Sequence, residues 1–243
     1  MKIPMFLQDL MGRNKAEVPG ETLPKDTPFF LEQFKSLRAK IDDLLDKEVC
    51  KTLAVTSSIA GEGKTITCVN LAMNIAYTGR RKVLLVDTDM RKSDLAKGMN
   101  LNPIPGLSEF LSGAVKLTDV IQNSKVPGLY VIPSGACPPS PADVLAGESF
   151  RQFIQSSREH FDLVLLDTPP VLPVADTHSL REQVDGFLLV YRAGHTPYPM
   201  LKQAIEDISE EKILGVVLNR VKPRTDNYYR KYYGKYYNKS YSK

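Results

Sequence analysis

The feature that most constrains the fold is the segment 57–65, which reads SSIAGEGKT and lies between a short apolar run and a helical pattern that begins near Ile66. A glycine-rich loop between a strand and a helix turns successive backbone N–H groups inward, and the helix N-terminus adds positive potential. Lys64 can then reach the β- and γ-phosphates of a nucleotide, while the Thr65 hydroxyl can ligate Mg²⁺. The usual GxxxxGK[ST] pattern has glycine where this chain has serine, so the loop is a variant. We expect nucleotide contacts from Arg91 and from the loop residues Ser58, Ala60, Gly61, Glu62, Gly63, Lys64, Thr65 and Ile66.

Two acidic motifs follow apolar runs further along the chain. Residues 83–91 read VLLVDTDMR, and residues 161–170 read FDLVLLDTPP. Parallel strands deliver such carboxylates to the edge of the sheet where ligands bind, beside the phosphate loop. We therefore expect the catalytic residues to be Lys64, Asp87, Asp89 and Asp167, the metal ligands to be Thr65, Asp87 and Asp167, and Arg91 to pair with the carboxylates near the nucleotide.

A site of this kind suits Mg·ATP. Phosphoryl transfer needs neutralised phosphate oxygens and a positioned nucleophile more than it needs covalent chemistry. Water as the acceptor would make the protein a switch ATPase, and a hydroxyl group would make it a kinase.

Short apolar runs alternate with helix-length stretches after Lys51, at residues 52–56, 83–86, 129–132, 163–166, 186–191 and 213–218. Runs of this kind are typical of an α/β sheet that is covered on both faces and is mostly parallel. Upstream, apolar residues at spacings of three and four predict an amphipathic helix that ends near Asp46. We predict one doubly wound domain over residues 29–222, with a flexible leader at 1–28 and a tail at 223–243.

Composition excludes several classes of protein. The 243 residues contain no run close to the roughly 18 apolar residues that a membrane-spanning helix needs, and the start lacks the features of a secretory signal. The cysteines Cys50, Cys68 and Cys137 show neither CxxC spacing nor an even count, which argues against a disulfide framework or a thiolate metal site. We therefore expect a cytoplasmic protein.

The chain is basic at its end and mildly acidic elsewhere. Its net charge is +4, to which residues 212–243 contribute +8 and the preceding residues −4. Seven of the eleven tyrosines lie in this end: Tyr228, Tyr229, Tyr232, Tyr233, Tyr236, Tyr237 and Tyr241. Phenol groups on flexible basic spacers suit repeated presentation to an active site, where Asp87 or Asp89 could take the phenolic proton. Alternatively, the tail binds RNA or acidic membrane through phosphate contacts and aromatic stacking.

These motifs resemble those of the bacterial tyrosine kinases, the P-loop kinases that regulate capsule and exopolysaccharide production. The resemblance covers about residues 29–221 and the tail, and it includes the phosphate loop, a modified second Walker motif at 87–91 and a Walker B motif at 167–170. Stretches outside the nucleotide motifs are also similar, at 106–113, 133–141 and 215–219. The resemblance implies a P-loop NTPase fold of the deviant Walker type, ATP and Mg²⁺ as cofactors, and autophosphorylation of the tail tyrosines.

The same resemblance implies partners. In the family, a helix before the core carries an ExxRxxR pattern that packs against the next subunit of a ring, and here Glu32, Lys35 and Arg38 occupy those positions. Lysine lacks the planar fork of arginine, which weakens a bidentate contact at Lys35. The resemblance further implies a membrane-anchored polysaccharide co-polymerase as activator, recruitment to the inner face of the membrane, a cognate phosphotyrosine phosphatase and no specific nucleic acid.

Two other functions stay open. Related partition and positioning ATPases carry a signature lysine that would fall at Ile59, and its absence, with Glu62 between two glycines, favours the kinase. A switch ATPase whose tail binds membrane or nucleic acid is the main alternative, and a nucleotide-sensing scaffold for polysaccharide assembly is the third. Asp176 could order the metal site or cap a helix, and Asn219 could meet the adenine edge or make a turn.

Overall fold

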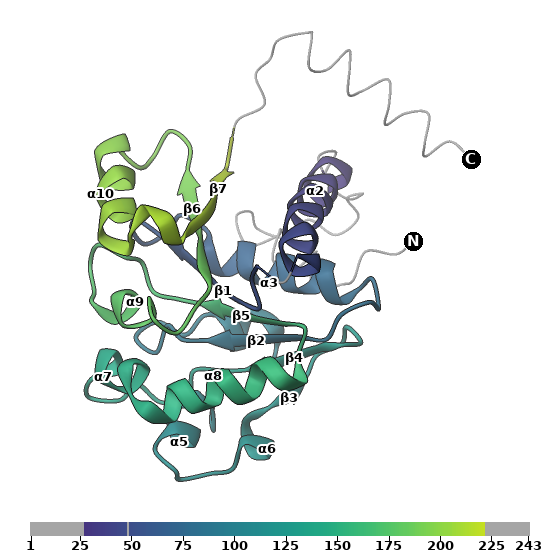
Figure 1. Ribbon diagram of the computed structural model, residues 1–243, viewed down its shortest axis with the longest axis vertical. Coiled ribbons are helices and arrows are strands. Elements are labelled where there is room, and N and C mark those ends of the chain that lie inside the picture. Colours follow the sequence, from purple (N-terminus) through teal and green to yellow (C-terminus); the bar gives the residue numbers. More distant parts are fainter. Residues whose placement is uncertain (1–26, 48, 222–243) are drawn as a thin grey trace, which may run out of the picture.

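A seven-stranded sheet forms the centre of the protein (Figure 1), in a computed structural model that describes residues 27–47 and 49–221. The strands are β1 (Thr52–Ser57), β2 (Val83–Asp87), β3 (Gln122–Asn123), β4 (Leu129–Ile132), β5 (Leu163–Asp167), β6 (Gly186–Arg192) and β7 (Ile213–Asn219). They lie in the order β3-β4-β2-β5-β1-β6-β7. Every neighbouring pair is parallel except β3 and β4. The predicted doubly wound, mostly parallel sheet is therefore confirmed.

Helices cover both faces of this sheet, which is why β1, β2 and β5 are buried along their whole length. One face packs against α2 (Thr27–Asp46), α3 (Lys64–Ala76) and α4 (Leu95–Met99). The other face packs against α5 (Leu107–Leu111), α6 (Leu117–Val120), α7 (Pro141–Ala146), α8 (Glu148–His160), α9 (Asp176–Ser179) and α10 (Tyr198–Ile208). A 3₁₀ turn at Glu210–Lys212 leads into β7.

The boundaries of the elements differ from the predictions in a few places. The helix before the core ends at Asp46 as predicted, but it begins at Thr27, inside the predicted leader. The helix after the phosphate loop begins at Lys64 rather than near Ile66. Residues 95–120 contain three short helices that the sequence analysis did not predict, because such short elements show no helical repeat. The rest of the leader and the predicted tail lie outside the described residues.

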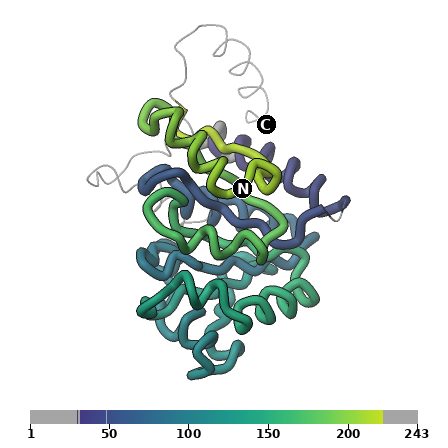
Figure 2. The backbone as a smooth tube through the Cα atoms, turned by 60° about the vertical axis from the view of Figure 1, so that its left-hand side comes forward, coloured from purple at the N-terminus to yellow at the C-terminus, as the bar shows by residue number. Residues whose placement is uncertain are grey.

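The order of the strands fixes where a ligand can bind. From β1 the chain crosses to β2 and then β4 on one side, whereas from β5 it crosses to β6 and β7 on the other side. In such sheets, ligands bind outside the carboxyl ends of the strands at the point where the direction reverses. Figure 2 shows the resulting division, with α2, α10 and β7 at one end of the molecule and the segment around residues 107–120 at the other.

No helix within residues 27–47 and 49–221 is both long enough and apolar enough to cross a membrane.

Candidate functional site

The phosphate loop connects β1 to α3 and contains two glycines in the left-handed backbone region. Gly61 has a φ of +83° and Gly63 a φ of +97°, conformations that other residues rarely adopt. Because α3 begins at Lys64, the first backbone N–H groups of this 13-residue helix have no partner within the helix. The helix also contributes the positive end of its dipole. The loop thus has the local geometry that phosphate binding requires.

Lys64 lies between the carboxylates that follow two neighbouring strands. Its Nζ atom is 2.7 Å from Oδ2 of Asp89 and 3.9 Å from Oδ1 of Asp167. Burial disfavours the charge on Lys64, but the carboxylates of Asp167 and Asp89 outweigh this effect and raise its pKa. Lys64 therefore stays protonated and is the cation at the centre of the predicted site.

The three predicted carboxylates come together at one edge of the sheet. Asp87 and Asp167 are in register on β2 and β5, and Asp89 follows two residues after β2. Asp87 accepts hydrogen bonds from the Ser93 hydroxyl at 2.8 Å and from the Asp89 amide at 3.0 Å. Burial and the charge of Asp167 raise the pKa of Asp87, and burial raises the pKa of Asp167 from 3.8 to about 6. The carboxylates are thus held close together at a cost in charge repulsion.

This arrangement fits a hard cation. Oδ1 of Asp167 is buried and has no hydrogen-bond partner among the described residues, and the Thr65 hydroxyl lies 3.4 Å from Nζ of Lys64. Carboxylate and hydroxyl oxygens are the ligands that Mg²⁺ prefers. Within residues 27–47 and 49–221 no group of three or more His, Cys, Asp and Glu residues is placed to hold a metal alone. Phosphate oxygens and water would therefore complete the coordination of Mg²⁺ here, as is usual for this ion.

Arg91 pairs with Asp176 rather than with Asp87, Asp89 or Asp167, so the predicted pairing is corrected. Its Nε and Nη2 atoms donate to the Asp176 carboxylate at 2.7 and 3.1 Å. The Asp176 side chain is fully buried, whereas that of Arg91 is 47% exposed. The carboxylate of Asp176 therefore holds Arg91 at the rim of the site.

Glu62 is placed differently from its neighbours in the loop. Its side chain is completely buried and binds Ile59, Arg192 and Thr196, away from Lys64. Only its backbone can therefore contribute to the predicted nucleotide contacts. Asn219 donates from Nδ2 to the Glu62 carbonyl at 2.7 Å, so this asparagine braces the loop.

The remaining predicted loop contacts have varied surroundings. Ser58 is buried, and its hydroxyl has no hydrogen-bond partner within the described part of the chain. Ala60 and Ile66 are exposed. The sequence did not indicate Thr196 or Ser93, because both lie outside the motifs and each acts only through its contact with a motif residue, Glu62 or Asp87.

The predicted oligomer contacts lie on α2. Lys35 donates to the Glu32 carboxylate on the same helix. Arg38 reaches instead toward the protein, where Nη1 donates to the Asn74 carbonyl of α3 at 3.4 Å and Nε lies 3.7 Å from Asp42. The structure therefore leaves Glu32 and Lys35 facing outward and uses Arg38 partly within the subunit. The seven tail tyrosines lie outside the described residues.

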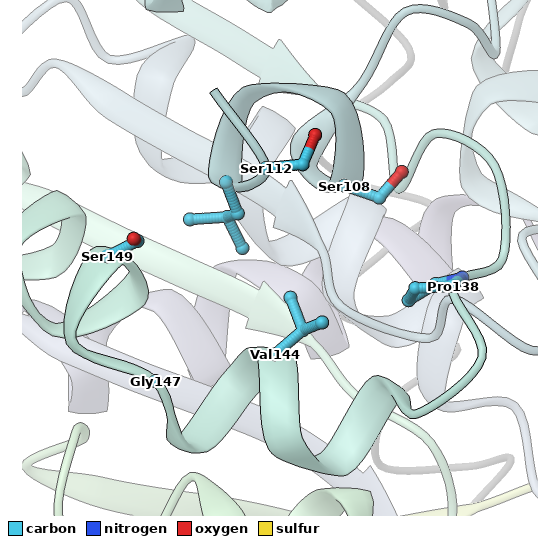
Figure 3. Close-up of a pocket in the computed structure, with 7 residues that line it drawn as sticks. Ser108, Ser112, Pro138, Val144, Gly147 and Ser149 are labelled. Atoms are coloured by element: carbon cyan, nitrogen blue, oxygen red, sulfur yellow. The ribbon is translucent and has the colours of Figure 1, made fainter. Parts of the chain in front are cut away.

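A separate pocket lies between α5, α7 and the start of α8 (Figure 3). It has a volume of about 190 Å³ and is lined by Ser108, Leu111, Ser112, Pro138, Val144, Gly147 and Ser149. Pockets for small-molecule ligands usually measure roughly 300–1,000 Å³. Its lining includes no residue of the phosphate loop and none of the three carboxylates, so we do not assign it to the nucleotide site.

Comparison with known proteins gives consistent matches. Residues 50–212 match a family described as an AAA domain. The tyrosine-protein kinase CpsD of Streptococcus agalactiae serotype III (strain NEM316) is 36% identical over 200 residues, which cover 81% of this chain and 85% of that protein. The kinase domain of the Escherichia coli tyrosine kinase ETK has a TM-score of 0.77 at 29% identity, and the match covers 88% of this chain and 86% of that one.

A more distant structure shares the fold. The septum site-determining protein MinD of Pyrococcus horikoshii OT3, complexed with Mg-ADP, has a TM-score of 0.58 at 23% identity, covering 70% of each chain. At this level of identity the similarity extends to the fold alone.

Proposed function

This chain belongs to the family of bacterial tyrosine-protein kinases, and from that premise we propose that it transfers the γ-phosphate of ATP to the tyrosines of its own tail. One observation carries the proposal within the structure: Lys64 lies 2.7 Å from Asp89 and 3.9 Å from Asp167, directly after the phosphate loop. Membership of the family indicates that the acceptor is a tyrosine, and this chain has seven candidate tyrosines between residues 228 and 241.

Each residue of the site has a distinct task in this proposal. The backbone N–H groups of residues 61–65 and the Lys64 ammonium bind the phosphates. Thr65, Asp87 and Asp167 hold Mg²⁺ directly or through water, and the ion supplies neutralisation of the developing charge on the phosphate oxygens. Arg91 stays at the rim, where its pair with Asp176 fixes its position.

The transfer of the phosphoryl group needs no reagent other than ATP and the tyrosine. The phenolic oxygen of a tyrosine forms a bond to the γ-phosphorus, and the bond between that phosphorus and the bridging oxygen of ADP breaks. The phenolic proton passes to one of two carboxylates, Asp87 or Asp89. Asp87 is oriented by hydrogen bonds from the Ser93 hydroxyl and the Asp89 amide, whereas Asp89 carries the hydrogen bond from Lys64.

The test is the intact mass of the purified full chain after phosphatase treatment and incubation with Mg·ATP. We expect a series of additions of one phosphate each that map to Tyr228–Tyr241 by peptide sequencing. The Lys64→Met variant should gain none. A variant with all seven tail tyrosines changed to Phe should lose most of the additions and should bind nucleotide as the unmodified chain does.

The same experiment distinguishes the alternative. Release of ADP without any gain in protein mass, also in the presence of the cytoplasmic segment of a membrane activator, would contradict the kinase. It would favour the switch ATPase, whose fold is shared by MinD. Salt-sensitive binding of RNA or lipid that ignores tyrosine modification would support the same conclusion.

The partners are part of the proposal. The chain acts in the cytoplasm, at the inner face of the membrane, with a membrane-anchored polysaccharide co-polymerase as its activator and a phosphotyrosine phosphatase that resets the tail. It assembles into a homo-oligomeric ring, for which α2 offers the outward-facing Glu32 and Lys35. Phosphorylation adds roughly −1.5 to −2 charges per tyrosine, so the net charge of a fully modified tail would change from positive to negative. This change would alter the assembly of the ring and thereby control capsule or exopolysaccharide synthesis.

A further inference from the structure

The carboxylate of Glu62 is bound by three donors from two different parts of the chain. Oε2 accepts a hydrogen bond from the Ile59 amide at 2.9 Å, within the phosphate loop itself. Oε1 accepts from the Arg192 amide at 3.0 Å and from the Thr196 hydroxyl at 2.6 Å. Arg192 ends β6 and Thr196 lies in the turn before α10. The carboxylate therefore ties the first half of the loop to the β6–α10 turn.

A second contact fixes the backbone of the loop between Glu62 and Gly63. Nδ2 of Asn219, at the end of β7, donates to the Glu62 carbonyl at 2.7 Å, and Oδ1 of Asn219 accepts from the Arg220 amide at 2.8 Å. A Cβ atom added at Gly63 would lie 2.3 Å from that Nδ2 atom. The asparagine therefore packs directly against the loop at the position where α3 starts. We call Glu62, Thr196 and Asn219 the loop brace.

The chemistry of the brace explains why an acidic residue stands here. An ionised carboxylate only accepts hydrogen bonds, and it can satisfy three donors at once. Glu62 and Thr196 are both almost completely buried, so the hydrogen bond between them is made away from water. Because the donors are two backbone amides and one hydroxyl, the brace orients the backbone of the loop rather than neutralising a cation.

We propose that Glu62 is a positioning residue that holds the phosphate loop in its binding conformation before the nucleotide arrives, and that Thr196 and Asn219 are its anchors. The inference rests on the proposed nucleotide site and deepens it. A loop held in place in advance loses less conformational freedom when phosphate binds. The brace also connects the loop to β7, the strand after which the tyrosine tail begins.

The decisive test compares two substitutions at Thr196 in the purified full chain. Thr196→Val removes the hydroxyl and keeps the shape, whereas Thr196→Ser keeps the hydroxyl. The probe is Mg·AMP-PNP, which is not consumed, and its dissociation constant is measured by titration calorimetry. Hydrogen bonds to charged groups are strong enough that we expect Thr196→Val to raise this constant about tenfold, with Thr196→Ser close to the unmodified chain. Urea unfolding without nucleotide gives the stability of each variant.

A matched control separates positioning from general loss of stability. Thr52 is as buried as Thr196, and its hydroxyl accepts from Nε of Arg158 at 2.8 Å, at the far end of β1 from the loop. Thr52→Val should lower the urea midpoint without changing the dissociation constant. Glu62→Gln should have the largest effect on nucleotide binding, about 100-fold, because its amide nitrogen would face a donor.

The outcomes separate the two proposals. If the unmodified chain does not bind Mg·AMP-PNP, the proposed nucleotide site is wrong. If it binds and Thr196→Val binds equally well, the site stands and the brace is wrong. An equal loss of affinity in Thr196→Val and Thr52→Val would also overturn the brace, because the effect would then follow from stability alone.

Discussion

Replacing Asp167 by Asn should stabilise the protein in the absence of Mg²⁺ and nucleotide while abolishing kinase activity. Asp167 is 1% exposed, and burial raises its pKa from 3.8 to about 6 despite the opposing attraction of Lys64. The folded protein therefore ionises this carboxyl less readily than the unfolded chain does. At about 1.36 kcal/mol per pKa unit, the ionised group lowers the free energy of unfolding by about 3 kcal/mol. Asparagine keeps the shape and removes that cost.

The sign of the effect follows from the direction of the shift. A group whose pKa rises on folding contributes stability at low pH, and this contribution is lost as the pH rises through the pKa of the folded state. The advantage of Asp167→Asn should therefore be about 1 kcal/mol at pH 4.5 and about 3 kcal/mol at pH 8. For a domain of this size, the latter corresponds to roughly 6–12 °C in Tm.

The assay is urea unfolding followed by circular dichroism at both pH values, with EDTA present to remove Mg²⁺. Asp43→Asn is a suitable control, because Asp43 is exposed and, within the described residues, its one ion pair is with Lys47 on the same helix. It should show no advantage that grows with pH. If Asp167→Asn is no more stable than the unmodified chain at pH 8, or if its advantage is the same at both pH values, burial does not raise the pKa of Asp167 as described.

Three further predictions follow from the geometry of the site. Gly63→Ala should lose both stability and nucleotide affinity, because its Cβ atom would lie 2.3 Å from Nδ2 of Asn219. Gly61 also has a positive φ, of +83°, but has open space around it, so Gly61→Ala should lose less of each in the same unfolding and binding assays. Arg91→Lys should lower the urea midpoint, because lysine cannot repeat the two hydrogen bonds to the buried Asp176 carboxylate. Binding of Mg·ADP near pH 6 should release protons from Asp167, whose pKa is raised by burial to about 6, and this residue should release fewer at pH 8. Calorimetry in buffers of different ionisation enthalpy measures the release, and equal release at both pH values would contradict the shift.

The fold could be predicted because its signal is local. Each buried strand is a short apolar run, and the helix before the core repeats its apolar residues at helical spacing. The phosphate loop and the two acidic strand ends could also be predicted, since the carboxyl ends of parallel strands share one edge. The strand β3 could not, because it has only two residues and pairs antiparallel with β4.

The contacts around the loop could not be predicted for the opposite reason. Thr196 lies 134 residues after Glu62, and Asn219 lies 157 residues after Glu62. Nothing in this spacing links the three residues. From the sequence, Asn219 could meet adenine or make a turn, and in the structure its amide braces the phosphate loop. Likewise, the carboxylate of Asp176 binds Arg91. Side-chain direction decides these roles, and it is set only when the whole sheet has assembled.

The charges of the site explain why nucleotide and metal should bind together. Asp87, Asp89 and Asp167 share one cation, and Lys64 hydrogen-bonds only Asp89 among them. Burial raises the pKa of the other two carboxylates, so their ionised forms are disfavoured relative to a carboxylate in water. If bound phosphates draw Lys64 toward themselves, as the proposed function implies, Asp89 would lose its partner and the negative charge at the sheet edge would increase. In the proposed function, a divalent cation that arrives with the phosphates would offset this repulsion, so each would make the binding of the other more favourable.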